Sequence, residues 1–320
     1  MVSLINPASG RPLQANGSEL VDDLGGRFPI IAGIPRICDA DNYTQNFGLQ
    51  WNTFDSTQLD RREIDLSADR FFAETGWSAD ELDGQDILEV GSGAGRFTQV
   101  VLDKTKARLW SVDFSSAVEA NLRNNGAIAP DRLKLFQASI YEMPFPDGSF
   151  DKVFCLGVLQ HTPDFEASVR ALVAKAKPGG EIVVDFYPIR GWWTKFNAKY
   201  LLRPLAKRMS HERLLRLIDK NVDWLMAAHR SLVRWRLGAL TRFLPIADLR
   251  YILPKALSAE QAREWAVLDT FDMFSPEYDQ PQRIERVVEM FRRNGARVTF
   301  ACHVGVADAQ AAVVRAIRDK

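Results

Sequence analysis

Residues 87–96 read ILEVGSGAGR. Four residues typical of a buried strand lead directly into three glycines, and a helix-like pattern begins at Arg96. Glycine lets the backbone turn sharply and approach a ligand closely, here just before a helix N-terminus whose amide groups point outward. The stretch therefore predicts a ligand site at the carboxyl end of this strand.

Strand-like and helix-like segments alternate after this stretch. Further strands are expected at 108–112, 133–137, 152–156 and 181–185, with helical patterns from about Arg96 and Ala117. Such alternation implies βαβ units with right-handed crossovers. The fold class we expect is α/β, with a doubly wound, Rossmann-like and mostly parallel sheet.

Asp113 follows the second of these strands, 18 positions beyond Gly95. A carboxylate placed in this way can accept hydrogen bonds from a ribose diol. The glycines run G-x-G-x-G instead of the G-x-G-x-x-G of nicotinamide binders, which favours a nucleoside without a pyrophosphate. The other interpretation of Asp113 is a cap for the helix that begins near Ala117.

Four motifs resemble the class I S-adenosylmethionine-dependent methyltransferases in order and spacing: LEVGSGAGRFT, SVDFS, the polar turn after FQAS, and FDKVFCLGVLQHTPD. The resemblance covers about residues 84–186 and implies S-adenosyl-L-methionine as the cofactor. It places the methionine part at the glycine loop, the ribose at the carboxylate after the second strand and the adenine after the third. The residues implied are Glu89, Gly91, Gly93, Gly95, Asp113, Phe114, Ser139 and Ile140. Many family members have Asp where Ser139 stands, and a serine hydroxyl can still accept from the adenine amino group.

His161 follows the strand at 152–156 and a short turn, which places it at the carboxyl edge of the sheet, beside the expected methyl group. A sulfonium methyl group is already activated, so the enzyme mainly has to hold the acceptor in line with it. An alcohol acceptor also benefits from a general base that titrates near the working pH. His161 is the candidate base. Its other interpretation is a histidine that braces the loop.

The segment 268–279 mixes aromatic residues with carboxylates and is interpreted as a loop bounded by Pro276 and Pro281. Because loops carry a large share of binding residues, this segment is a candidate wall of an acceptor pocket. Tyr278 and Asp272 are its candidate catalytic residues. The other interpretation is packing of the insert against the edge of the sheet.

The chain divides into four regions by pattern. Residues 1–40 predict a small β-rich appendage that resembles the Trm112 methyltransferase activators. Asn6 and Ser9 stand there in the places where zinc-binding cysteines would be expected, so we predict no metal site. The other regions are leading helices with the cofactor-binding core, a basic helical insert, and a final helix with a strand, at 41–186, 187–280 and 281–320.

Residues 46–51, within the leading helices, resemble the helix that covers the cofactor in related proteins. Gln50 and Trp51 are candidate contacts. Core packing is the other role for Trp51, because large aromatic side chains are usually well buried.

The composition favours an ordinary globular protein in a reducing compartment. The 320 residues carry 41 Lys plus Arg against 41 Asp plus Glu, so net charge does not select nucleic acid as a partner. The three cysteines form no CxxC pair, the chain does not begin with a signal-like segment, and no stretch reaches the roughly 18 apolar residues of a membrane span. We expect a cytoplasmic location.

The neutral total hides a strongly basic segment. Residues 190–250 hold 10 Arg and 4 Lys against 3 Asp and 1 Glu, a net charge of +10, interleaved with tryptophans and leucine-rich stretches. This is typical of amphipathic helices whose basic face meets anionic lipid, phosphate or nucleic acid, and it suggests peripheral contact with a membrane. The other interpretation is a cap with a solvated basic face and its aromatic residues in its own core.

The function we expect is methyl transfer, by O-methylation, to a small-molecule or glycan acceptor, and the basic insert would suit a phosphorylated or lipid-linked one. An RNA methyltransferase is one alternative. Against it, FCLGVLQHTPD lacks the Asn/Asp-Pro-Pro-aromatic signature of many amino-methylating relatives, so nucleic acid is disfavoured as a partner. A non-catalytic protein that binds the cofactor and activates a partner is the other alternative.

Overall fold

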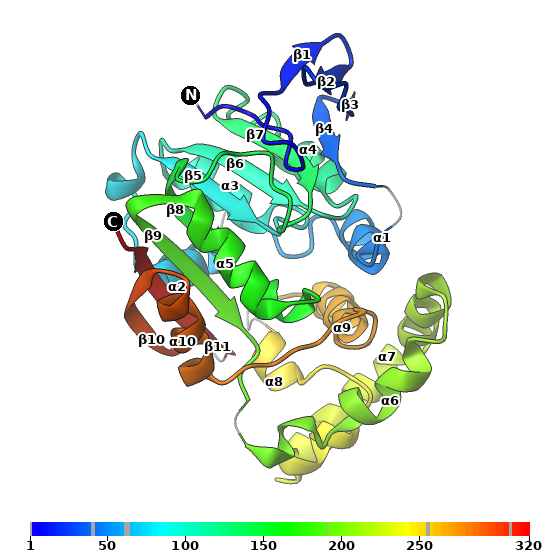
Figure 1. Cartoon of the computed structure of the whole chain (residues 1–320). Helices are drawn as coiled ribbons and strands as arrows, with labels where there is room; N and C mark the ends of the chain where they lie inside the picture. The colour runs from blue at the N-terminus through cyan, green and yellow to red at the C-terminus, as the bar shows by residue number, and fades with distance from the viewer. Residues whose placement is uncertain (1, 40–41, 61–64, 190, 254–256, 307–308) are drawn as a thin grey trace.

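The computed structural model describes residues 2–39, 42–60, 65–189, 191–253, 257–306 and 309–320. Within these ranges the chain forms an 11-stranded sheet of order β1-β2-β3-β4-β7-β6-β5-β8-β9-β11-β10. Helices cover the sheet, and a group of helices projects from one end of it (Figure 1). The expectation of an α/β, doubly wound and mostly parallel fold with a β-rich appendage and a helical insert is confirmed.

Five parallel strands make the centre of the sheet. In spatial order they are β7 (Leu133–Ala138), β6 (Arg108–Asp113), β5 (Asp86–Val90), β8 (Phe150–Cys155) and β9 (Ala176–Phe186). Every residue of β5 is buried, as expected for a strand covered on both faces. The chain winds outward from β5 through β6 to β7 and then returns to β8 on the other side of β5. This reversal makes a topological switch point between β5 and β8, the usual ligand crevice of open α/β sheets.

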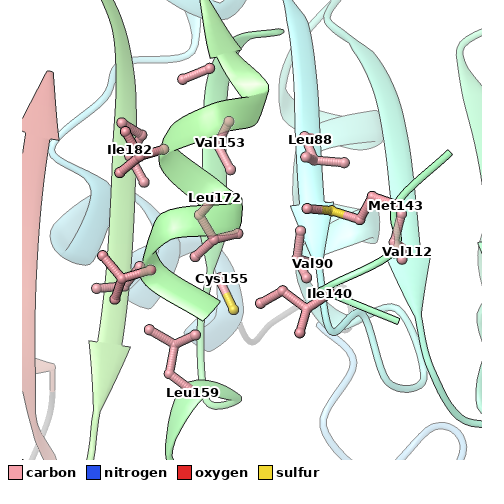
Figure 2. Packing of buried hydrophobic residues seen from close by; sticks show 14 of the residues in the cluster. Leu88, Val90, Val112, Ile140, Met143, Val153, Cys155, Leu159, Leu172 and Ile182 are labelled. Atoms are coloured by element: carbon pink, nitrogen blue, oxygen red, sulfur yellow. The ribbon is translucent and has the colours of Figure 1, made fainter. Parts of the chain in front are cut away.

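Side chains alternate between the two faces of the sheet and build two cores. Leu88 and Val90 point to the face covered by α5 (Phe165–Lys175) and α10 (Ile284–Arg293), and Figure 2 shows Leu172 of α5 above this layer. Ile87 packs on the opposite face, which is covered by α2 (Leu66–Thr75), α3 (Arg96–Lys104) and α4 (Val118–Asn125). The period of two in β5 therefore assigns each apolar side chain to one core.

The N-terminal segment continues the sheet. Its strands are β1 (Gln14–Asn16), β2 (Glu19–Val21), β3 (Arg27–Ile31) and β4 (Ile34–Ile37). The pairing of β4 with β7 is parallel and sets Arg36 opposite Gln137. The buried Arg36 guanidinium donates to the Gln137 side chain over 2.9 Å and to Glu119 over 3.0 Å. The appendage is thus tied to the third strand of the core by backbone and side-chain bonds.

The insert forms a helical unit with its own core. Its elements are η3 (Trp192–Lys195), α6 (Ala198–Ala206), α7 (His211–Arg234), η4 (Gly238–Phe243), α8 (Leu249–Ile252) and α9 (Ala259–Phe274). Leu214, Ile218 and Val222 recur on one face of α7 and pack with Ala266 and Phe271 of α9. Figure 1 shows α6 and α7 away from the sheet, with α9 between α7 and the core. No helix in the described ranges is both long and apolar enough to cross a membrane.

The interpretation of 268–279 as a loop is wrong for its first half. A capping box at Ser258 and Gln261 starts α9, and the helix continues through Phe274. Leu268 and Phe271 are fully buried on it, so the apolar side chains that suggested a domain seam also hold a helix in place. Asp272 therefore stands on a helix, and the loop begins only at Ser275.

The C-terminal region holds two strands where the sequence suggested one. Beyond α10, β10 (Ala296–Val306) and β11 (Ala309–Arg318) form an antiparallel pair, and β11 inserts between β10 and β9. The helix η1 (Asp80–Leu82) precedes β5. Because β11 is rich in alanine and does not alternate polar with apolar residues, its sequence gave only a weak strand signal.

Candidate functional site

The sheet register brings three predicted cofactor positions to one edge. Val90 pairs with Val112, so Gly91 and Asp113 leave adjacent strands side by side, and the Gly91 amide donates to the Val112 carbonyl over 2.7 Å. Asp113 in turn lies opposite Gln137, two residues before Ser139. The glycine loop, the ribose candidate and the adenine candidates therefore line neighbouring strand ends.

The glycine loop requires glycine for two physical reasons. Gly91 and Gly95 have φ angles of 82° and 89°, in the left-handed region that L side chains rarely adopt. A Cβ atom on Gly91 would also lie 2.2 Å from a Val158 methyl, and one on Gly95 would lie 2.1 Å from the Asn125 amide. The loop after β5 is thus packed tightly against the loop after β8, across the switch point.

The Asp113 carboxylate holds the glycine loop to the end of β6. It accepts from the Gly93 amide over 2.8 Å, and from the amide and hydroxyl of Ser115 over 2.8 and 2.7 Å. Burial raises the pKa of Asp113, although these hydrogen bonds favour the charged form. The capping interpretation is wrong, because the N-cap of α4 is Ala117 and its first turn receives no side-chain cap. The ribose contact remains the prediction for this carboxylate.

Glu89 lies beneath the loop and faces the helices. Its buried carboxylate accepts hydrogen bonds from Thr98 of α3 and from Ser111 of β6, the latter over 2.8 Å. Burial raises the pKa of Glu89 to about 7. The described contacts of this carboxylate thus brace the loop from below, and a cofactor contact for it stays a prediction.

The adenine-side candidates differ in accessibility. The Phe114 ring is half-buried and packs against Tyr43 with 5.3 Å between the ring centroids. The Ser139 hydroxyl is buried at the end of β7 and accepts from the Tyr141 amide over 3.2 Å. Ile140 is buried in the core under α5. All three follow β6 or β7 at the predicted edge, and their role toward adenine stays a prediction.

Helix α1 (Gln45–Thr53) lies over the glycine loop. The half-buried Trp51 indole lies 3.1 Å from the place where a Cβ of Gly93 would stand. The Asn52 amide donates to the Ser116 carbonyl over 3.1 Å, which joins α1 to the segment before α4. The structure thus places the segment 46–51 against the glycine loop, and its contact with the cofactor stays a prediction.

His161 ends the short helix η2 (Leu159–His161) after β8 and is buried. Its Nδ1 lies 3.1 Å from the Tyr278 carbonyl oxygen. Because a carbonyl only accepts, Nδ1 carries the proton and Nε2 keeps its lone pair. Burial lowers the pKa of His161 below its ordinary value of 6.5, which favours the neutral ring. This Nε2 is buried and has no hydrogen-bond partner among the described residues.

Asp272 and Tyr278 reach this histidine in different ways. The Asp272 carboxylate accepts from the Tyr187 hydroxyl over 3.0 Å, and the Tyr187 ring packs edge-on to the His161 ring with 5.6 Å between centroids. Tyr278 contacts His161 through its carbonyl, and its own ring packs on Tyr43 at 5.2 Å. The structure therefore brings the three catalytic candidates together, with the Tyr278 phenol turned toward Tyr43.

Three further residues of this cluster were not predicted. Tyr187 lies just beyond β9, and Lys199 of α6 stands over its ring at 4.7 Å while forming a 2.7 Å ion pair with Asp279. Asp269 stands one helical turn before Asp272, and burial raises its pKa to about 7. The carboxylates of α9 carried the only sequence signal, since Tyr187 and Lys199 belong to no motif.

Unpartnered polar atoms gather around the switch point. Ser92 Oγ, Gln160 Oε1, His161 Nε2 and Gln50 Oε1 are buried and find no hydrogen-bond partner within the described residues. Such atoms are costly unless a ligand or water completes them. Ser92 lies within the glycine loop between Gly91 and Gly93, Gln160 and His161 follow β8, and Gln50 is on α1. This donor and acceptor set suits a polar ligand such as the amino-acid and nucleoside parts of S-adenosylmethionine.

The N-terminal segment replaces the expected metal ligands with a hydrogen-bonded group. The Asn6 amide and the Ser9 hydroxyl both donate to Asp22, over 2.5 and 3.2 Å. These bonds lower the pKa of Asp22, with the Asn6 bond contributing most. In the described part of the chain, no group of three or more His, Cys, Asp or Glu residues is placed to hold a metal ion.

Comparison with known proteins identifies the central region. Residues 88–184 match the family model described as a methyltransferase domain. A tRNA U34 carboxymethyltransferase from Nautilia profundicola is 32% identical over 112 residues, which cover 34% of this chain and 37% of the relative. The ubiquinone/menaquinone biosynthesis C-methyltransferase UbiE from Vibrio parahaemolyticus is 31% identical over 130 residues, covering 39% and 46%. The chain thus spans less than half the length of these curated relatives.

A solved chain from the complex between the Haloferax volcanii Trm112 methyltransferase activator and a methyltransferase has a TM-score of 0.51 to this chain. The sequence identity is 12%, and the match covers 86% of this chain and 98% of that chain. At this identity the likeness concerns the fold alone. Residues 88–184 therefore form a methyltransferase domain with the class I fold, whose cofactor is S-adenosylmethionine.

Proposed function

We propose that the chain transfers a methyl group from S-adenosylmethionine to a hydroxyl oxygen of a small-molecule or glycan acceptor, with His161 as general base. The observation that carries the proposal is the state of His161. Burial lowers its pKa and so favours the neutral ring, its Nδ1 faces the Tyr278 carbonyl, and its Nε2 is buried without a hydrogen-bond partner among the described residues. An imidazole fixed in this tautomer is ready to accept a proton.

The bound cofactor supplies an activated methyl group. This chain would hold the acceptor oxygen in line with that group, receive the acceptor proton on His161 Nε2 and keep water out. The tilted contact of Phe47 and the edge-on contact of Tyr187 with the imidazole, with 5.2 and 5.6 Å between ring centroids, restrict how that ring can turn. As the proton arrives, the nearby Asp272 carboxylate favours the charged imidazolium.

Carboxylates dominate the side of the site that faces the insert. Asp269 and Asp272 lie one turn apart on α9. Of the cations near them, Lys199 is already paired with Asp279, Arg70 is paired with Glu74 and Asp185, and Arg96 donates to Ser67 and Gln58. A phosphate would meet repulsion here, whereas hydroxyl groups can donate to these carboxylates. We therefore assign a polyhydroxy or phenolic group to the reacting end, and place any phosphate or lipid link of the acceptor nearer the basic insert.

The test is labelled methyl transfer into fractionated cell extract, with the wild-type chain and a His161→Gln variant side by side. Label in a polar or lipid fraction that resists mild base and is lost with the variant supports the proposal. Label that disappears after ribonuclease treatment would establish the RNA alternative, which the net charge of +10 in residues 190–250 supports. Binding of S-adenosylmethionine without transfer to any fraction would instead favour a partner-activating role.

A further inference from the structure

The exposed apolar side chains of this molecule are concentrated in the insert. Of the 17 large hydrophobic residues that are exposed within the described ranges, 12 lie between Phe196 and Tyr251. Scattered single exposures are normal, but a concentration of this size marks an interaction surface. We propose that this part of the insert is a docking surface for an anionic lipid bilayer. The proposal is independent of the function proposed above.

Helix α6 turns its leucines outward. Leu201, Leu202 and Leu205 are exposed by 57, 39 and 55%. The inward face instead carries Arg203, whose guanidinium donates to the Pro276 carbonyl over 2.6 Å, and the small Ala206. The helix is therefore held to the protein by a polar contact on its inner face, and its exposed leucines are free to contact a lipid bilayer.

A second apolar group lies between α7 and α8. It consists of four strongly exposed side chains, Trp235 at 76%, Leu237 at 49%, Leu240 at 47% and Phe243 at 44%. The Phe243 ring packs against that of Phe196, just before α6, with 5.6 Å between centroids. This contact joins the two groups. We call the exposed side chains of Phe196, Leu201, Leu202, Leu205, Trp235, Leu237, Leu240 and Phe243 the insert apolar surface.

Uncompensated positive charge accompanies the insert apolar surface. Seven exposed basic residues form no ion pair within the described chain: Arg208, Arg213, Arg216, Lys220, Arg230, Arg234 and Arg236. The acidic residues nearby are largely neutralised, since Asp219 and Asp223 pair with Arg263 at 2.9 and 3.1 Å, and Asp248 pairs with Arg250 at 2.6 Å. The free charge that this region offers a partner is therefore positive.

The combination of these two features selects among partners. An anionic bilayer accepts leucine and aromatic side chains at its interface and attracts each nearby Lys or Arg. Trp235 suits the headgroup level, where indole rings are enriched. RNA would use the cations but has no partner for three exposed leucines on one helix. A second copy of this chain would bring two uncompensated basic surfaces together, which is disfavoured.

The test is sedimentation of the full chain with vesicles of phosphatidylcholine alone or of phosphatidylcholine mixed with phosphatidylglycerol. We expect binding to the mixed vesicles, weakened by salt, and little binding to the neutral ones. A Leu201→Ser/Leu205→Ser/Trp235→Ser variant should bind at least about tenfold more weakly. The matched control is Leu24→Ser/Ile31→Ser, since both residues are exposed on the N-terminal segment. S-adenosylmethionine affinity, measured on every variant, reports on folding.

A charge series completes the test. Arg230→Gln/Arg234→Gln/Arg236→Gln should weaken binding to the mixed vesicles by roughly 100-fold, from about 1 kcal/mol for each of the charges removed. Arg170→Gln/Arg286→Gln/Arg292→Gln, outside the insert, should leave it unchanged. The proposal is overturned by absent binding, by equal binding to neutral vesicles, or by equal losses in the control variants. It is also overturned if the serine variant abolishes a dimer while vesicle binding persists, or if RNA but not mixed vesicles binds the chain.

Discussion

The candidate site has two sides: the donor side, where the glycine loop and Asp113 are expected to hold the methyl donor, and the acceptor side, where His161 and Asp272 are expected to meet the methyl acceptor. The two sides are built in opposite ways. On the donor side, Asp113 and Glu89 are held by groups 2 to 22 positions away in the chain. On the acceptor side, the amide of Gln50 donates to Asp272, 222 positions away, and His161 bonds to a carbonyl 117 positions away. The first is a local arrangement of one βαβ unit, and the second joins α1, η2, α9 and the segment after β9.

This difference separates the two halves of a methyl transfer. The local side fixes a loop that only glycine can form, and the same loop can serve any acceptor. The long-range side depends on how the insert docks, so its residues can change without disturbing the donor. Function should therefore divide cleanly, with donor-side changes acting on cofactor affinity and acceptor-side changes acting on turnover.

The largest effect is expected from His161→Gln on the acceptor side. If His161 is the general base, kcat should fall by about 10²- to 10⁴-fold, while calorimetry should find an unchanged affinity for S-adenosylmethionine. Because burial keeps its pKa below 6.5, the wild-type rate should decline only as the pH falls below that value. The control is His303→Gln, at an exposed histidine on β10. Full turnover in His161→Gln would remove this residue as the base.

Gly91→Ala should disrupt the glycine loop on the donor side. The new methyl group meets Val158 at 2.2 Å on a backbone with φ of 82°, which should lower the free energy of unfolding by about 2–4 kcal/mol and abolish cofactor binding. Gly84→Ala is the matched control, because its φ is 74° but nothing lies within 4 Å of the added methyl. Chemical denaturation of both variants checks the comparison, and equal losses would mean that contact with Val158 is unimportant.

Asp113→Asn tests the ribose assignment. A neutral amide keeps the size of the side chain but accepts more weakly, so cofactor affinity should drop by roughly 10- to 100-fold, as for hydrogen bonds to charged groups. The kcat value at saturating cofactor should change little. Asp131→Asn, at an exposed position, is the control in the same calorimetric titration. An unchanged affinity in Asp113→Asn would place the ribose elsewhere.

The smallest expected effect is that of Glu89 on how the free energy of unfolding depends on pH. Since burial raises its pKa to about 7 in the folded chain, the folded state binds its proton more tightly, and stability should fall as pH rises from about 4.5 to about 7. Glu89→Gln keeps a group that Thr98 and Ser111 can donate to and should reduce this fall by about 1–2 kcal/mol. Urea unfolding at pH 5 and pH 8 measures it. Glu285→Gln, exposed on α10, should leave the slope as it is.

The strand, the glycine loop and the carboxylate on the donor side could be predicted because their signals are local, and their contacts with the cofactor stay a prediction. Glycines that need positive φ, a buried strand before them and a carboxylate after the next strand lie within a span of 27 residues, from Ile87 to Asp113. Each of these signals depends on one residue, such as the positive φ of Gly91 or the Asp113 carboxylate that accepts from the Gly93 amide. The parallel pairing of the central strands was expected from the alternation of strands and helices, whereas their order comes from the structure.

His161, Asp272 and Tyr278 were named from the sequence, but the contacts that join them on the acceptor side were not, because these contacts are long-range. The Tyr187 hydroxyl bonds to Asp272 because β9 ends beside α9. The sequence pattern of neither segment predicts this contact. The sequence of the buried end of α9 resembled that of a loop because carboxylates interrupt its apolar pattern. The strand β11 escaped because an alanine-rich run has little strand propensity, and its place between β9 and β10 depends on pairing with both.

The pairing of β4 with β7 bears on the order in which the chain can fold. The Arg36 side chain bonds to Gln137, 101 positions later, so the segment that holds β4 must wait for the third core strand before its outer edge is paired. Until then β3 pairs with one edge of β4, and the edge of β4 that will face β7 stays unpaired. A nascent chain paused before residue 138 would expose a binding edge for chaperones or for other chains.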